Sequence, residues 1–595
     1  MFMRYVLLFF FLTIAVMAQS KPPVWAKGIV WYQIFPERFS NGDLTNDPDS
    51  IKVFTGSRKI PAGWEVTSWT SDWFYKAPWE KEFGPLLRDG INYRRYGGDL
   101  QGIINKLDYL KNLGIGAIYL NPMFEAVSLH KYDASTYHHI DVNFGPDPQG
   151  DRKLIATETP DNPATWLMTS ADKLFVKFID EAHKRDIKVI IDGVFNHTGV
   201  EFWAFKDIVK NQKKSAYADW YEITSFKETG DSLGKFDYTG WWGTKSLPQF
   251  NRTKDNLFPA VKNYICAATK KWMDPNGDGN PSDGIDGWRL DVAREVPLGF
   301  WKDWHSVVKS TNPNAIIIGE LWELSPDFIG ANGVFDALMN YNFAYAVNDF
   351  FIAQKTKITA DTMIARLKEI DRTYPEENLQ VLQNLTSSHD TERLLSMIAN
   401  PDRKFDHDAD ERNPDYNPGK PKPEHYDILK MIIAFQMTYR GAPMIYYGDE
   451  VGMWGADDPH DRQQMLWEEL SYMTQVVNEE SGFAAGQGTY KVAADKNLFK
   501  FYKKMIALRN YFDVLKTGSV EFLPVTENKY IFGYKRILGS DTILVLFNLS
   551  DKSEVLDFPV TSTSVLDLTV GDKVPVMSPN LRIVLWGKSC AMYKL

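Results

Sequence analysis

The chain has 595 residues, more than one ordinary domain, and 44% of them are hydrophobic. This content supports a large buried core and excludes a disordered chain. The formal net charge of −10 argues against a nucleic-acid partner, because no basic surface replaces the counterions of a phosphate backbone. Nineteen Trp and 28 Tyr are a high aromatic load, and their flat faces suit the CH-rich faces of sugar rings.

The first 18 residues predict a secretory signal peptide. One positive charge, at Arg4, precedes an apolar run over 5–17, and the small residue Ala18 marks the expected cleavage site. The run is shorter than the roughly 20 residues of a membrane span, so we expect export without a stable membrane anchor. The mature protein would be periplasmic or extracellular. A retained signal anchor is the alternative.

Eight apolar, strand-like runs follow in chain order, with helical patterns between them. This alternation is typical of a parallel sheet, and eight is the number of strands in an α/β (β/α)8 TIM barrel. The segment ADKLFVKFIDEAHKRD before the third run is one of the expected helices. The runs are residues 28–35, 116–124, 188–197, 284–293, 315–322, 335–341, 378–390 and 442–450.

Two segments depart from the barrel pattern: one lies within the expected catalytic domain, 19–511, and the other follows it. Residues 199–258 are aromatic, irregular and too long for a simple βα loop, so we expect a small inserted domain after the third strand. From residue 512 the pattern changes to short alternating runs such as KYIFGYKRI and DTILVLFNLS. These runs predict a C-terminal antiparallel β-sandwich over 512–595.

Three acidic residues stand at the ends of predicted strands: Asp291 in GWRLDVA, Glu320 in IIIGELWE and Asp390 in LTSSHDTER. The C-terminal ends of barrel strands meet at one face, so the three carboxylates should converge there. Converging acids suit glycoside chemistry, in which a retaining enzyme needs two carboxyl groups about 5–5.5 Å apart. Arg289 lies two residues before Asp291, on the same face of the strand, so its cation should hold Asp291 ionised. For each acid alone, a helix cap or a surface ion pair is the alternative.

Several motifs together carry a family resemblance. DGVFNH, GWRLDVA, GELW, SSHD and GAPMIYYGDE occur in the order typical of the α-amylase family, glycoside hydrolase family 13. From about Trp25 onward the chain most resembles the neopullulanase and cyclomaltodextrinase branch. The resemblance implies that Asp291 is the nucleophile and Glu320 the general acid/base. It also implies that Asp390 distorts and stabilises the sugar at the cleavage site.

The same resemblance implies a set of substrate-binding residues. His197 and His389 would donate hydrogen bonds to hydroxyls of one sugar, and such bonds can strengthen in the transition state. Tyr132 would stack at the cleavage site beside Asp133. Trp322 would form an aromatic platform on the leaving-group side, with core packing as the alternative. The set also contains Arg289, Arg294 and Arg462, of which Arg294 favours amylase-like behaviour on the leaving-group side.

Two segments predict calcium sites, because Ca²⁺ takes 6–8 hard oxygen ligands. DPNGDGNPSDG at 274–284 opens like an EF-hand loop, but Ile285 stands where that loop needs Glu, so Asp283 or outside groups must complete the site. The other segment resembles the calcium site of the branch, with an Asx-rich turn as the alternative. The expected ligands of the branch site are Asn41, Asp43, Asn46, Asp47, the Gly97 carbonyl and Asp99, and those of the EF-hand-like loop are Asp274, Asn276, Asp278 and Asp283.

Two insertions and two cysteines have no assigned function. Residues 144–166 and 401–426 are the insertions; the second follows the seventh strand, so we expect a solvated loop, with a rim of the cleft as the alternative. Cys266 and Cys590 match no metal-ligand spacing, which predicts two buried thiols, with a disulfide between them as the alternative.

The expected activity is hydrolysis of α-1,4-glucosidic bonds in maltodextrins, cyclodextrins, pullulan or starch by double displacement. The protein would act as a monomer or homodimer. An α-glucan transglycosylase is one alternative, because a sugar hydroxyl can replace water in taking the same covalent intermediate. A non-catalytic glycan-binding member of the family is the other. It would be expected to lack one of the three carboxylates, all of which are present.

Overall fold

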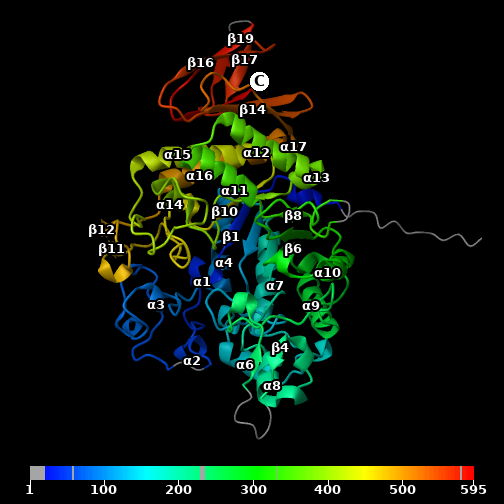
Figure 1. Cartoon of the computed structure of the whole chain (residues 1–595). Helices are drawn as coiled ribbons and strands as arrows, with labels where there is room; N and C mark the ends of the chain where they lie inside the picture. Colours follow the sequence, from blue (N-terminus) through cyan, green and yellow to red (C-terminus); the bar gives the residue numbers. More distant parts are fainter. Residues whose placement is uncertain (1–20, 57–58, 228–234, 331–332, 577–578) are drawn as a thin grey trace, which may run out of the picture.

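The computed structural model describes residues 21–56, 59–227, 235–330, 333–576 and 579–595. The predicted signal peptide lies outside these residues. A barrel occupies the middle of the molecule, with the C-terminal sheets at one end and the segment containing β4 and α8 at the other (Figure 1). Within these ranges no helix combines the length and the apolar character that a membrane crossing requires.

The predicted parallel barrel is present. Its strands pair in the order β8-β7-β6-β3-β2-β1-β10-β9, and a parallel bridge between Met339 and Gln383 joins the two ends of the sheet. Each strand lies within its predicted run. The strands are β1 (Trp31–Ile34), β2 (Ala117–Leu120), β3 (Lys188–Gly193), β6 (Gly287–Leu290), β7 (Ile316–Gly319), β8 (Ala337–Leu338), β9 (Gln383–Asn384) and β10 (Ala442–Tyr446).

Helices cover the outside of the barrel. β1, β2 and β7 are buried along their whole length, as expected for parallel strands covered on both faces. The capping box of Thr169 and Asp172 begins α7, which buries Phe175, Phe178 and Ile179. The helices around the barrel are α4 (Leu100–Asn105), α5 (Leu107–Leu113), α7 (Ser170–His183), α9 (Pro259–Met273), α10 (Leu298–Thr311), α11 (Tyr341–Val347), α12 (Ala360–Thr373), α14 (Leu394–Ala399), α15 (Pro423–Thr438) and α16 (Lys496–Tyr511), with the short α1 (Pro36–Phe39) and α13 (Glu376–Leu379).

The segment after β3 forms a small aromatic unit. It contains α8 (Trp203–Asn211), β4 (Ile223–Ser225) and β5 (Asp237–Tyr238). Phe205 of α8 packs edge-on against Tyr221 and Tyr238. An antiparallel bridge between His197 and Gln249 returns the chain to the end of β3, so this unit lies against the end of the barrel that carries the predicted acids.

A second side unit was not predicted. Residues 48–56 and 59–96, with α2 (Ser50–Val53) and α3 (Arg88–Ile91), pack against β11 (Gln475–Val477) and β12 (Gly488–Tyr490). Their shared core includes Trp73, Phe74, Tyr416 and Phe483. Tyr416 belongs to the 401–426 insertion, so the expectation of a solvated loop is wrong: aromatic side chains anchor that insertion in a core.

The C-terminal segment is antiparallel, as predicted. A six-stranded sheet in the order β13-β14-β15-β20-β17-β18 faces the pair β16-β19 across a core that contains Leu544, Leu546 and Ile583. The elements are α17 (Asp513–Thr517), β13 (Ser519–Phe522), β14 (Ile531–Leu538), β15 (Asp541–Asn548), β16 (Glu554–Pro559), β17 (Ser564–Asp567), β18 (Lys573–Pro575), β19 (Asn580–Leu585) and β20 (Ser589–Lys594).

The two cysteines are free in the structure. Cys266 and Cys590 are half-buried, so the predicted full burial is not observed, and the alternative disulfide is absent. Burial raises the pKa of each thiol to about 11, which keeps both sulfurs protonated and unreactive at neutral pH.

Candidate active site

The predicted nucleophile and acid/base follow neighbouring strands. Asp291 comes directly after β6 and Glu320 directly after β7, and both side chains are buried. Arg289 Nη1 lies 3.0 Å from Asp291 Oδ1, and its Nη2 lies 3.0 Å from Glu320 Oε2. One guanidinium therefore bridges the two carboxylates and fixes them side by side at the C-terminal end of the barrel.

A third carboxylate, which sequence reasoning missed, completes this group. Asp192 on β3 lies opposite Arg289 in the strand register, and its Oδ2 is 2.9 Å from Arg289 Nη1. Tyr119 and Tyr132 donate their hydroxyls to the same oxygen at 2.7 and 2.9 Å. The sequence did contain a signal for this residue. Asp192 is an acid within the apolar run KVIID, and a buried carboxylate requires a polar or charged partner.

Burial and mutual repulsion raise the proton affinity of the site. Burial and the neighbouring Glu320 raise the pKa of Asp291, and the opposing effect of Arg289 is smaller. Arg289 thus favours the ionised form of Asp291, as predicted, against the effects of burial and of Glu320. Burial and Glu320 also raise the pKa of Asp390 to about 7. Carboxylates this close cannot all ionise easily, so Asp291 and Asp390 hold protons more strongly than isolated carboxyl groups do.

Glu320 is oriented by hydrogen bonds on both of its oxygens. The backbone N–H of Val292 donates to Oε2 at 2.8 Å, and Trp322 Nε1 donates to Oε1 at 3.0 Å. The Trp322 ring stacks on Tyr341 with 3.9 Å between ring centroids. Trp322 is partly exposed and lines a cavity, so it both packs on its neighbour and presents a surface to the cleft.

Asp390 belongs to a second group that adjoins the first. His389 Nε2 lies 3.1 Å from Asp390 Oδ2, and Arg462 Nη2 lies 3.4 Å from its Oδ1. The His389 and Tyr132 rings are stacked, with 5.4 Å between their centroids and 7° between their planes. The Tyr132 hydroxyl forms a hydrogen bond with His389 Nε2. Gln33 Nε2 donates to the other ring nitrogen of His389 at 2.8 Å. Four predicted residues thus form one connected wall.

His197 is buried with a free ring nitrogen. Among the described residues its Nε2 has no hydrogen-bond partner, although the side chain is fully buried. Burial lowers the pKa of His197 to about 3, so the ring is neutral. A buried polar nitrogen without a partner is costly, which points to a ligand group that would bond to it.

Two predicted residues lie outside this contact network. Asp133 accepts hydrogen bonds from the backbone and side chain of Ser128, which shapes the loop below Tyr132. Arg294 donates to Glu323 at 2.8 Å and lies 3.2 Å from Asp327 in a half-exposed ion-pair group. The structure shows no contact of Arg294 with the three predicted catalytic acids within the described chain.

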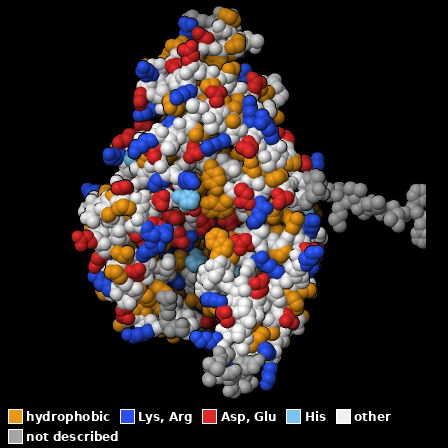
Figure 2. Space-filling model, in the orientation of Figure 1, with side chains coloured by type: hydrophobic (Ala, Val, Ile, Leu, Met, Phe, Trp, Pro, Cys, Tyr) orange, Lys and Arg blue, Asp and Glu red, His pale blue; other side chains and the backbone are white. Residues whose placement is uncertain are grey.

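One face of the molecule carries a central depression (Figure 2). Figure 2 shows acidic side chains at the bottom of a central depression and hydrophobic patches on both of its sides. One rim belongs to the 401–426 insertion: Phe405 and Asp406 line a cavity together with Trp322 and Tyr345. Burial and nearby acids raise the pKa of Asp406 to about 9, so this side chain is a neutral hydrogen-bond donor at the rim.

The first predicted calcium ligand set has oxygen atoms that suit a cation. Asn41 Oδ1 and Asn46 Oδ1 are buried and have no hydrogen-bond partner in the described structure. Burial raises the pKa of Asp47 and of Asp99 to about 6. Gly97 has φ +76°, and a Cβ there would lie 1.9 Å from Asp47 Oδ1. The residues present therefore fit Ca²⁺.

The second predicted set forms a loop with fewer free oxygens. Asp274 accepts hydrogen bonds from the backbone of Gly277 and Gly279, and Asp278 accepts one from Asn280. Asp283 Oδ1 is buried and has no partner within the described residues. The loop has the expected turn but, of the predicted ligands, offers only this one buried oxygen with no partner.

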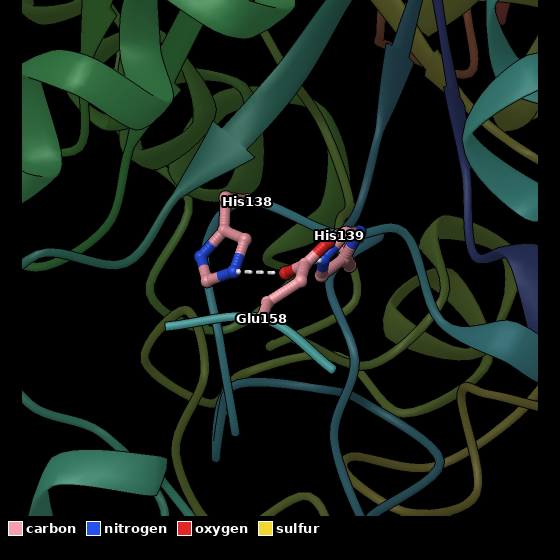
Figure 3. A group of neighbouring side chains, drawn as sticks. All are labelled: His138, His139 and Glu158. Atoms are coloured by element: carbon pink, nitrogen blue, oxygen red, sulfur yellow. Dashed lines mark hydrogen bonds and ion pairs between the residues drawn. The ribbon is translucent and has the colours of Figure 1, made fainter. Parts of the chain in front are cut away.

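A cluster that was not predicted holds the 144–166 insertion in place; we call His138, His139, Glu158 and Asp172 the histidine cluster. His139 Nδ1 lies 2.9 Å from Asp172 Oδ2 and its Nε2 lies 2.8 Å from Glu158 Oε2, while His138 Nε2 lies 3.4 Å from the same Glu158 oxygen (Figure 3). Trp166 stacks on His138 at 4.2 Å.

The histidine cluster is an ion-pair network. Its ligand-type atoms lie within 4.8 Å of one another, as they would around a metal ion, but each already has a partner. Both carboxylates beside His139 only accept hydrogen bonds, so its ring donates from both nitrogens and is positively charged. Burial lowers the pKa of His139, but the hydrogen bonds to Asp172 and Glu158 raise it overall.

The fold and the site together define a barrel glycosidase. Residues 33–158 and 170–518 match the family model described as "Alpha amylase, catalytic domain". The chain belongs to the α-amylase family of glycoside hydrolases, which confirms the resemblance that the sequence motifs carry.

Relatives in this family extend over most of the chain. A cyclomaltodextrinase from Bacillus sp is 35% identical over 90% of this chain and 74% of its own length. Neopullulanase 2 from Thermoactinomyces vulgaris is 33% identical over 95% and 77%, respectively. Among solved structures, a cyclomaltodextrinase superposes with a TM-score of 0.69 at 32% identity, covering 97% of this chain and 79% of that one. A cyclic α-maltosyl-(1→6)-maltose hydrolase from Arthrobacter globiformis has a TM-score of 0.68 at 25% identity, covering 97% and 100%.

Proposed function

We propose that this protein cleaves α-1,4-glucosidic bonds in maltodextrins, cyclodextrins, pullulan or starch, with retention at the anomeric carbon. Its membership of the α-amylase family makes it an α-glucan hydrolase. The observation that supports a retaining mechanism is the guanidinium of Arg289, which contacts Asp291 and Glu320 through its two terminal nitrogens. A retaining enzyme needs such a close pair of carboxyl groups.

In the first step Asp291 attacks the anomeric carbon. The glycosidic bond breaks, and Glu320 gives its proton to the leaving oxygen, so that a neutral sugar departs and a covalent glycosyl-enzyme remains. Hydrogen bonds from the Val292 N–H and Trp322 Nε1 hold Glu320 in place for this transfer. His197, His389 and Asp390 would hold hydroxyls of the sugar whose ring acquires positive charge.

In the second step water replaces the departed sugar. Glu320, now a carboxylate, takes a proton from water while the water oxygen attacks the anomeric carbon. The bond to Asp291 breaks and its carboxylate is restored. Two inversions give net retention.

Calcium, export and assembly belong to the same proposal. The free oxygens of Asn41 and Asn46 support a Ca²⁺ ion that stiffens the loop after β1 and takes no part in the chemistry. The N-terminal sequence supports export to the periplasm or the medium. The mature protein would work as a monomer or homodimer.

The test is an assay of the purified mature protein in calcium buffer. γ-Cyclodextrin and soluble starch are supplied separately, and NMR follows the anomer that forms first. Products that are short sugars and appear first as the α-anomer support the proposal. Products that appear first as the β-anomer contradict retention. Longer products than the substrate would indicate transglycosylation. An Asp291→Asn variant with unchanged circular dichroism should lose turnover by about 10³-fold or more.

A further inference from the structure

Two tryptophans of the segment after β3 extend the catalytic group toward the surface. The centroids of the Trp241 and His197 rings are 4.9 Å apart, with 14° between the ring planes. The centroids of the Trp242 and Trp241 rings are 5.2 Å apart, with 27° between the ring planes. The three rings form one stack. It begins at the buried histidine with the unpartnered nitrogen and ends in solvent, where Trp242 is 83% exposed.

One carboxylate holds both indoles in this stack. Trp241 Nε1 donates to Glu295 Oε2 at 2.8 Å, and Trp242 Nε1 donates to Glu295 Oε1 at 2.9 Å. Glu295 ends the short helix η9 (Ala293–Glu295), four residues after Asp291. The orientation of the two rings is therefore coupled to the loop that carries the nucleophile.

The backbone around Trp242 is also unusual. Trp242 has φ 47° and ψ 31°, a left-handed conformation that bulky side chains rarely adopt. Backbone hydrogen bonds from Trp241 to Leu247 and from Thr244 to Trp241 close the tight loop that holds it. Packing does not explain this arrangement, because the outer face of the ring is open. Strained residues held by their surroundings are typical of binding sites.

We propose that Trp242 is a stacking platform for a glucosyl unit of an α-glucan chain, outside the sugar at the cleavage site. The open indole face is flat and apolar, as is the CH-rich face of a glucose ring, and hydroxyls at the ring edge remain hydrated. Glu295 is a positioning residue that keeps the platform aligned with the catalytic group. This inference rests on the proposed function and adds a subsite to it.

The experiment compares chain lengths. Mature Trp242→Ala, Trp242→Phe and Trp586→Ala proteins are assayed with maltoheptaose and with the shortest maltodextrin that the wild type cleaves. Trp586 is the matched control, because it is 67% exposed in the C-terminal segment. We expect Trp242→Ala to lose about 5- to 20-fold in kcat/KM on maltoheptaose, mainly through KM, and less than about twofold on the short substrate. Trp242→Phe should retain most of the activity, and Trp586→Ala should match the wild type.

The Glu295→Gln variant tests whether Glu295 aligns the Trp242 platform or supports the loop that carries Asp291. The amide NH2 replaces one of the two accepting oxygens and cannot accept from an indole, so one hydrogen bond is lost. We expect a smaller loss than in Trp242→Ala, confined to maltoheptaose. An equal loss of kcat on both substrates would instead place Glu295 in support of the Asp291 loop and overturn its assigned role.

Failure of this inference is distinct from failure of the proposed function. If the wild type cleaves maltoheptaose and Trp242→Ala cleaves it equally well, the proposed stacking role of Trp242 is wrong, while the proposed hydrolase activity is supported. If the wild type cleaves no α-glucan, maltoheptaose binding is measured by calorimetry, and equal affinity of wild type and Trp242→Ala overturns the platform. A change of sedimentation behaviour in Trp242→Ala with unchanged kinetics also overturns it, because Trp242 would then join two copies of the chain.

Discussion

At the scale of single residues, the site depends on the charge and shape of Arg289. This guanidinium contacts Asp192, Asp291 and Glu320, all within 3.0 Å. An ammonium is a point charge and cannot bridge two carboxylates with separate nitrogens, so Arg289→Lys should lower kcat by about 10²-fold or more. Arg289→Met should also cost about 3–5 kcal/mol of unfolding free energy, because three buried acids lose their counter-charge. Turnover and urea unfolding measure the two effects. Wild-type kcat in Arg289→Lys would contradict the bridging role.

Arg462 should control the acid side of the pH profile. Its guanidinium lowers the pKa of Asp390, which burial and Glu320 raise to about 7. Replacing Arg462 by Met removes the lowering effect, so Asp390 stays protonated up to a higher pH. In the proposed mechanism Asp390 acts as a carboxylate, and the acid limb of kcat/KM should therefore move to higher pH. Arg294→Met is the control, because Arg294 pairs with surface acids and should leave the limb in place. An unmoved limb in Arg462→Met would show that another group sets it.

At the scale of elements, the 401–426 insertion forms a rim instead of a solvated loop. Phe405 packs edge-on against Tyr345 at 5.5 Å and Tyr341 at 6.4 Å, and Tyr341 in turn stacks on Trp322. Truncating Phe405 to Ala should destabilise the protein by about 3 kcal/mol and raise KM, because the platform beside Glu320 loses its support. Phe405→Leu retains most of the volume and is the control. A free energy of unfolding within about 0.5 kcal/mol of wild type would mean that the insertion folds independently of the cleft.

The cluster around His139 should stabilise the 144–166 insertion in a limited pH window. The folded pKa of His139 is raised above 6.5, so its contribution is complete below pH 6.5 and is lost as the pH rises through the folded value. Glu158 has a folded pKa of about 2 against 4.5 unfolded, so its contribution is complete above pH 4.5 and is lost toward pH 2. Glu158→Gln should therefore lower Tm by at least about 2 °C between pH 4.5 and 6.5, and by less above that range. A Tm difference that does not depend on pH would rule out the ion pair.

At the scale of the whole molecule, local patterns predicted what depends on local sequence. All eight barrel strands lie within their predicted runs, because buried parallel strands are continuous apolar segments. The three acids converge because strand ends meet at one face. Asp192 was missed because its partner lies on another strand, 97 residues away. The side unit that contains Trp73 was missed because its core joins residues far apart in the sequence, such as Trp73 and Phe483. The Trp241–Trp242 stack was missed because an irregular loop sets the orientation of its rings.

Calcium should stabilise the whole molecule mainly through the first predicted site. Asp99 begins α4 by accepting from Gly102, and it also accepts from Gly42 and Asp43, so an ion there would join the loop after β1 to the helical layer. The second predicted site lies on an exposed loop and offers one buried oxygen without a partner, on Asp283, whereas the first offers two, on Asn41 and Asn46. An ion at about 100 times its Kd adds about 2.7 kcal/mol to the folded state. EGTA should therefore lower Tm of the mature protein. Asp47→Ala should remove most of this EGTA effect, whereas Asp278→Ala should retain it. The reverse order would identify the 274–284 loop as the stabilising site, and a Tm that EGTA leaves unchanged in the wild type would exclude both.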